Sequence, residues 1–87
     1  MAKKARGLTK SLHSPEYAAF CELLVAARRK AALTQHDVAD RLKRPQSFVA
    51  KYEGGERRLD LLEFVEVMRV INADPIRMLR ILIKSRK

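Results

Sequence analysis

The sequence predicts an all-α fold, a compact domain of five short helices. Two observations support this class. Apolar residues recur at intervals of three and four along most of the chain, and no stretch alternates apolar and polar residues with the period of a strand. The few glycines and prolines lie where helices are expected to begin or end. A length of 87 residues allows one domain with a single modest core.

The chain is expected to open with a flexible basic arm over residues 1–13, which are polar and lack a sustained apolar period. Ser14 then provides an N-cap, Pro15 suits the first helical position, and Glu16 places an acid in the first turn. The first helix is therefore predicted over about residues 15–30.

The second and third helices form a closely spaced pair. Thr34 is expected to cap the second helix, with Asp37 completing a capping box. Residues 43–44 then form a turn, and Pro45 is expected to start the third helix. Gly54 and Gly55 end that helix, because glycine takes the left-handed conformation without steric cost.

The fourth and fifth helices show the same signals. Asp60 is a capping residue with Glu63 closing the box, and Asn72 is a plausible left-handed terminator. Asp74 and Pro75 begin the last helix. We expect Ile76, Leu79 and Ile83 to share its inner face with Leu82, leaving Met78 and Ile81 to point elsewhere.

The distribution of charge is informative. The chain carries 19 Lys and Arg against 10 Asp and Glu, a formal net charge of +9. Basic residues dominate the arm, the tail after residue 83, and the segment 41–58, which holds six basic and two acidic residues. This pattern fits a polyanionic partner, although a basic solvated surface explains the charge alone equally well.

Several classes of protein are disfavoured. Cys21 is the single cysteine, so no internal disulfide or cysteine-based metal site is expected, and the residue is predicted to be a buried small hydrophobe. No run approaches the ~18 apolar residues of a membrane span. His13 and His36 form no catalytic or metal-binding pattern. We therefore expect no enzyme activity, no cofactor and a cytoplasmic location.

The segment 35–52, QHDVADRLKRPQSFVAKY, resembles a helix-turn-helix. Its inward positions hold apolar residues, and Ala39 lies where the two helices approach most closely. With LTQ at 33–35, YEGGERR at 52–58 and DP at 74–75, the chain is similar to the lambda-repressor/Cro-like (XRE-type) family over about residues 15–83.

This resemblance implies a five-helix lambda-repressor-like DNA-binding domain over residues 14–84, with the helix-turn-helix at 35–53 and a basic tail at 85–87. It implies a bacterial or phage protein that regulates transcription, as a repressor, by sequence-specific binding of double-stranded DNA. Lys43 and Ala32 stand where the family usually has glycine. If they remain left-handed, each costs roughly 1–2 kcal/mol relative to glycine.

The third helix is expected to enter the major groove with its N-terminal residues at the base edges. The predicted base-reading residues are Gln46, Ser47, Phe48, Ala50 and Lys51. The predicted phosphate-binding residues are Gln35, Lys43, Arg44, Arg57 and Arg58. By resemblance, Gln35 also braces Gln46, and Arg28 pairs with Glu53 in a structural ion pair.

Other partners remain open. The exposed apolar residues of the last helix suggest a homodimer, with Met78, Ile81 and Ile83 as candidates for its interface. An antitoxin that binds a protein toxin and represses its own operon is the main alternative. A protein–protein adaptor and an RNA-binding protein are weaker alternatives, because the polar start of the third helix and the lack of a stacking platform argue against them.

Overall fold

The structure, a computed structural model, describes residues 14–85, and within them it contains five helices and no strand. The predicted arm at 1–13 and the tail residues 86–87 lie outside this range. The helices are α2 (Pro15–Lys30), α3 (Gln35–Leu42), α4 (Gln46–Glu53), α5 (Leu61–Val70) and α6 (Pro75–Ser85). The predicted all-α class is confirmed.

The helix starts follow the predicted side-chain caps. The Ser14 hydroxyl accepts a hydrogen bond from the Tyr17 amide at 3.1 Å. Capping boxes are complete at α3, between Thr34 and Asp37, and at α5. Pro45 differs by one position: its backbone is extended, so it is the N-cap of α4 rather than the first helical residue.

Three connections turn through a left-handed residue that is not glycine. Ala32, Lys43 and Asn72 have φ angles of 61°, 58° and 57°. The left-handed conformation predicted for Asn72 is therefore confirmed, and Ala32 and Lys43 keep that conformation although they stand where the family usually has glycine. Among the glycines, Gly55 has a positive φ of 80°, just beyond the end of α4.

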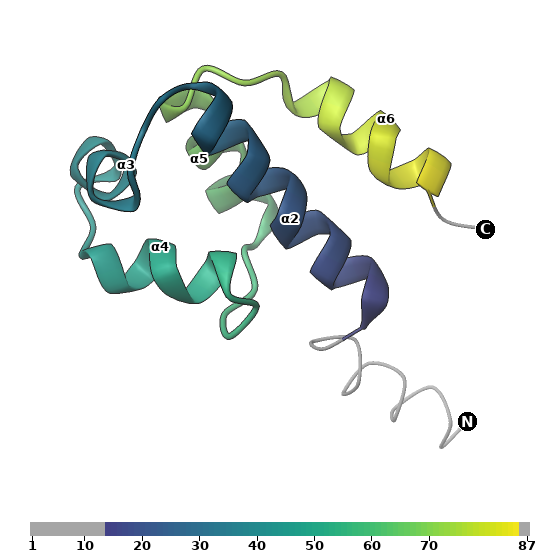
Figure 1. The fold of residues 1–87 in the computed structure, drawn as a ribbon, viewed down its shortest axis with the longest axis horizontal. Helices are drawn as coiled ribbons and strands as arrows, with labels where there is room; N and C mark the ends of the chain where they lie inside the picture. The colour runs from purple at the N-terminus through teal and green to yellow at the C-terminus, as the bar shows by residue number, and fades with distance from the viewer. Residues whose placement is uncertain (1–13, 86–87) are drawn as a thin grey trace.

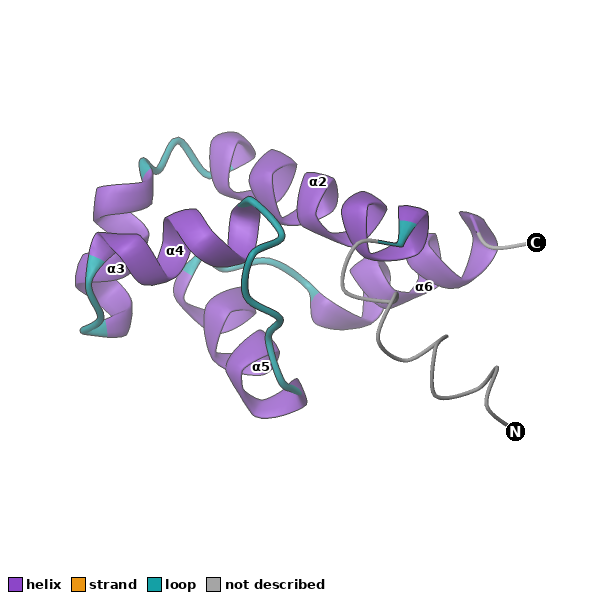
Figure 2. Ribbon diagram, turned by 90° about the horizontal axis from the view of Figure 1, so that it is seen from below, coloured by secondary structure: helices purple, strands orange, loops and turns teal. Residues whose placement is uncertain are grey.

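The helix α2 crosses the middle of the molecule (Figure 1) and packs against α4 and α6. In that view α3 is seen nearly end-on while α4 lies across the page, so the two helices cross at a large angle. Figure 2 shows α5 below α4, and Phe64 of α5 packs against Phe20 of α2 with their ring centroids 5.5 Å apart. The core contains buried side chains from every helix, among them Leu24, Val38, Val49, Tyr52, Phe64, Val67, Met68 and Met78.

The orientation of α6 differs from the prediction. Met78 is only 6% exposed and belongs to the core, and Leu82 is half-buried, whereas Ile76, Leu79 and Ile83 are exposed. Residues spaced by three and four form an apolar stripe on both sides of this helix, so periodicity does not indicate which stripe faces inward. Met78 is therefore excluded as a residue of a surface interface, while Ile81 and Ile83 remain exposed.

Candidate nucleic-acid interface

The α3–α4 unit has the geometry of a helix-turn-helix. Lys43 ends α3 in the left-handed conformation, and its amide donates to the carbonyls of Ala39 and Asp40. Pro45 follows in an extended conformation, with a ψ of 152°, and α4 begins at the next residue. Ala39 is buried beside Val49, so the small side chain allows the helices to approach.

One face of α4 is exposed to solvent. Gln46, Ser47, Ala50 and Lys51 are exposed, as their predicted base-reading role requires, while Val49 and Tyr52 are buried. These exposed side chains therefore lie on the opposite face of α4 from the buried Val49 and Tyr52.

Phe48 departs from the prediction that it reads bases. Its side chain is 8% exposed, and its ring packs edge-on against Tyr52, four residues later on the same side of α4. The guanidinium groups of Arg44 and Arg57 lie over the ring, 4.4 and 4.8 Å from its centroid. Phe48 is therefore a core residue covered by two cations, and it is withdrawn as a base-reading residue.

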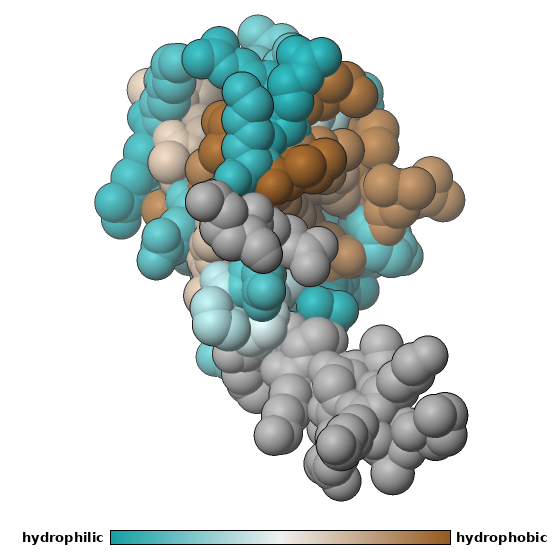
Figure 3. All heavy atoms as spheres, turned by 90° about the vertical axis from the view of Figure 1, so that its right-hand side faces the viewer, coloured by the Kyte–Doolittle hydropathy of each residue, from teal (hydrophilic) through white to brown (hydrophobic). Residues whose placement is uncertain are grey.

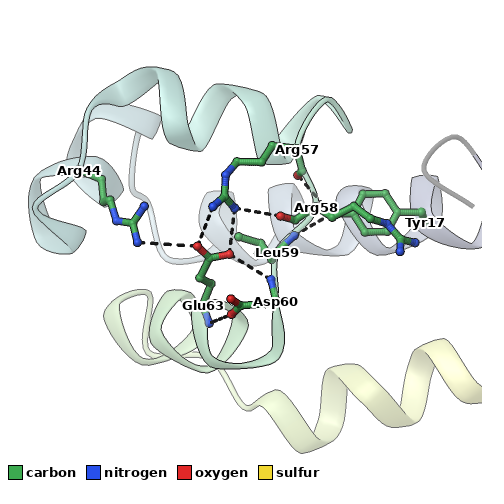
Figure 4. Close-up of polar contacts among 7 residues, drawn as sticks. All are labelled: Tyr17, Arg44, Arg57, Arg58, Leu59, Asp60 and Glu63. Atoms are coloured by element: carbon green, nitrogen blue, oxygen red, sulfur yellow. Dashed lines mark hydrogen bonds and ion pairs between the residues drawn. The ribbon is translucent and has the colours of Figure 1, made fainter. Parts of the chain in front are cut away.

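The two arginines that cover Phe48 share the carboxylate of Glu63 (Figure 4). Arg57 donates to both carboxylate oxygens, at 2.9 and 2.8 Å, and Arg44 lies 3.7 Å from one of them. Glu63 also accepts the Asp60 amide at 3.0 Å as part of the capping box. These hydrogen bonds, first from Arg57 and then from Asp60, lower the pKa of Glu63 to about 2.

The loop between α4 and α5 is fixed to the start of α2 by Tyr17. The Tyr17 hydroxyl accepts from the Leu59 amide at 3.2 Å and donates to the Arg57 carbonyl at 3.4 Å. The guanidinium of Arg58 lies 4.6 Å from the centre of the tyrosine ring. Burial raises the pKa of Tyr17 above its ordinary value.

A chain of polar contacts connects the interior to the exposed face of α4. Arg28 donates to Glu53 at 2.7 and 3.1 Å, and Gln35 donates to the same carboxylate at 2.9 Å. Gln46 in turn contacts the Gln35 side-chain oxygen at 3.5 Å. The ion pair implied by the family resemblance is therefore present, and Gln35 lies between it and Gln46.

Two contacts could not be predicted from the sequence. Glu63 was recognised only as a capping residue, and nothing in the spacing of Arg44, Arg57 and Glu63 indicated that they meet. Arg41 donates to the Val70 carbonyl at 2.8 Å and so binds the end of α5 to α3. A basic residue near a predicted helix C-terminus is a known stabilising arrangement, but here it comes from another helix.

Metal binding and membrane spanning were also considered for the part of the chain that the structure describes. Within residues 14–85, no group of three His, Cys, Asp or Glu side chains is placed to hold a metal ion. No helix in the same range is long and apolar enough to cross a membrane. Cys21 is buried, and its thiol donates to the Tyr52 carbonyl at 3.3 Å.

Comparisons with known proteins support the fold and the family. An XRE-family-like protein from Pseudomonas syringae pv. tomato str. DC3000 is 45% identical, with a TM-score of 0.81, over 92% of this chain and 98% of that one. A restriction-modification controller protein has a TM-score of 0.73 at 19% identity, over 83% and 91% of the two chains, and shows the shared fold alone. No family model and no curated protein matches the sequence.

Proposed function

Because the chain belongs to the XRE family, we propose that it is a sequence-specific DNA-binding transcriptional regulator with α4 in the major groove. The observation that carries this proposal is the exposure of Gln46, Ser47, Ala50 and Lys51 on one face of a helix that follows a tight turn. An α-helix fits the major groove and reads it with such side chains. Repression is the proposed output, since it requires only that a site be occupied.

Each exposed residue has a suitable partner on DNA. The Gln46 amide pairs with an adenine edge, and the Ser47 hydroxyl accepts or donates to several bases. The Ala50 methyl group contacts a thymine methyl. Lys51 reaches guanine or a phosphate. Gln35 orients Gln46 through the 3.5 Å contact between their side chains.

Residues beside α4 would bind phosphates and fix the register without reading sequence. Lys43 and Arg44 are exposed in the turn before α4, and Arg58 is exposed in the loop after it. Gln35, at the start of α3, completes this set. Arg57 was predicted to act in the same way, but most of its donor groups are occupied within the chain.

A homodimer is the proposed binding form. Exposed apolar side chains are concentrated on α5 and α6: Leu61, Leu62, Val65, Ile76, Leu79, Ile81 and Ile83. Figure 3, which looks toward the end of α6, shows apolar side chains gathered on one side of that face. Exposed apolar surface of this kind is typical of an interaction site. Two copies would read half-sites about 34–36 Å apart.

The dimer is tested by measuring mass in solution, with and without DNA, for wild type and for Ile76→Glu/Ile83→Glu. The double variant is expected to be monomeric. The control variant Ala18→Glu adds an acid at an exposed position of α2 and is expected to remain dimeric. A wild-type monomer at tens of micromolar would contradict the dimer. The apolar face would then remain for another protein, as the antitoxin alternative requires.

Sequence-specific binding is tested by selecting duplexes from a random DNA pool. Wild type is expected to enrich a palindromic sequence, and Gln46→Ala/Ser47→Ala to lose that enrichment. Arg80→Ala, which removes a charge from exposed α6, is the control and should select the same sequence. Binding without enrichment by wild type would contradict sequence-specific reading by α4.

A further inference from the structure

Three charged residues from three parts of the chain converge beside Phe48. Arg44 comes from the turn before α4, Arg57 from the loop after it, and Glu63 from the first turn of α5. Both arginines lie over the Phe48 ring, and both face the Glu63 carboxylate (Figure 4). We call Arg44, Arg57 and Glu63 the arginine clamp.

The two arginines of the clamp differ in how they are held. Arg57 makes three hydrogen bonds, two to Glu63 and one to the Arg58 carbonyl at 2.9 Å. Within residues 14–85, Arg44 has one contact with a charged group, 3.7 Å from the Glu63 carboxylate, and its side chain is 46% exposed. The Arg57 guanidinium is thus held within the fold by several hydrogen bonds, whereas the Arg44 guanidinium is held more loosely and is accessible to solvent.

We infer that Glu63 is a positioning residue for DNA binding: it fixes Arg57 over Phe48 and holds Arg44 ready to contact a phosphate. Arg57 is then part of the scaffold rather than a phosphate-binding residue. This inference rests on the proposed function. It goes beyond the capping role of Glu63, because it assigns the same carboxylate to the surface beside the recognition helix.

A positioning role for Glu63 and a simple count of charges predict opposite effects of its removal on DNA affinity. Removing an acidic residue near DNA should strengthen binding, because phosphates repel it. If Glu63 instead positions Arg44, its loss leaves a flexible side chain that must be ordered when DNA binds. Ordering one such side chain corresponds to roughly three- to tenfold in affinity.

The test compares Glu63→Gln with Glu66→Gln on the duplex that wild type selects. Gln also completes a capping box, so the first variant is expected to fold. Glu66 lies one turn along α5 in an exposed pair with Arg69, and its variant removes the same charge. We expect Glu63→Gln to bind roughly three- to tenfold more weakly than wild type, and Glu66→Gln to bind at least as tightly as wild type.

Two further measurements do not depend on that comparison. The Nε–H proton signals of Arg44 and Arg57 should be shifted upfield by the Phe48 ring in wild type and lose that shift in Glu63→Gln. The slope of log Kd against log salt should fall by about 0.9 in Arg44→Gln and stay unchanged in Arg57→Gln.

Equal or tighter binding by Glu63→Gln than by Glu66→Gln would overturn the inference, as would ring-shifted arginine signals that persist in Glu63→Gln. A lower salt slope in Arg57→Gln would restore Arg57 as a phosphate-binding residue and also overturn it. If wild type itself selects no duplex, the proposed function fails instead, and the arginine signals still report whether the clamp exists.

Discussion

The guanidinium of Arg28 meets the carboxylate of Glu53 through two hydrogen bonds, although the residues are 25 positions apart. The two side chains are 12% and 4% exposed. Arg28 also donates to the Leu33 carbonyl at 2.9 Å. The pair therefore fixes the end of α4 to α2 and to the connection before α3, and the Glu53 hydrogen bond raises the pKa of Arg28.

Replacing Arg28 by Ala is expected to destabilise the protein strongly, because it leaves the Glu53 carboxylate buried without its cation. The expected loss is about 3–5 kcal/mol, and each kcal/mol lowers the Tm of a domain of this size by roughly 4–8 °C. Thermal unfolding followed by circular dichroism measures the change. Arg29→Ala, an exposed neighbour on α2, is the control, and equal midpoints for wild type and Arg28→Ala would contradict the role of the pair.

The elements of the fold were predictable because their signals are local. Caps such as Thr34 with Asp37 and terminators such as Asn72 act within four residues, so the sequence alone locates them. The Arg28–Glu53 pair connects distant residues and came only from the resemblance to a known family.

The wrong predictions concern residues whose burial depends on tertiary packing, because the local sequence allows two orientations of the side chain. Phe48 was expected at the surface because it follows Ser47 in the exposed start of α4, yet it shares a face with buried Tyr52. Met78 was misplaced because α6 has two apolar stripes. The contact of Glu63 with both arginines depends on the path of the loop after α4, which no local signal encodes.

Lys43→Gly tests the left-handed turn between α3 and α4. Glycine removes the steric cost of the φ of 58° in the folded protein, which stabilises it. Glycine also makes the unfolded chain more flexible, and this offsets part of the stabilisation. The expected net change is a free energy of unfolding about 0.5–1 kcal/mol higher, measured by urea denaturation. DNA affinity should fall, and the salt slope should drop by about 0.9.

Asn72→Gly is the matched control, since it relieves the same conformation at the end of α5 without removing a charge. It should leave DNA binding unchanged. Lower stability in Lys43→Gly would show that the lysine side chain makes a stabilising contact that outweighs its backbone strain.

Cys21 is expected to react slowly with thiol reagents in the folded protein. Its side chain is buried and donates to the Tyr52 carbonyl, and burial, followed by the nearby Glu53 carboxylate, raises its pKa. Less of the reactive thiolate is therefore present at a given pH, and reaction requires local opening. Labelling with a disulfide reagent at pH 8 should be much slower than in concentrated urea. Equal rates would contradict the burial of the thiol.

The arginine clamp predicts a specific acid sensitivity. The pKa of Glu63 is about 2 in the folded protein, below its ordinary value of 4.5, chiefly because Arg57 donates to its carboxylate. A carboxylate with a lowered folded-state pKa stabilises the protein fully above the unfolded-state pKa, and this stability is lost as pH falls toward the folded-state pKa. Wild type should therefore have a higher Tm than Glu63→Gln at pH 7, and the difference should shrink between about pH 4.5 and 2.

Comparing the two proteins at each pH isolates this effect, because the titration of other carboxylates, including Asp37 with its own lowered pKa, is common to both. Glu66→Gln, which removes the exposed partner of Arg69, should differ little from wild type at pH 7, because such surface pairs contribute little to stability. A difference between wild type and Glu63→Gln that stays constant from pH 7 to pH 2 would mean that the charge of Glu63 contributes nothing to the clamp.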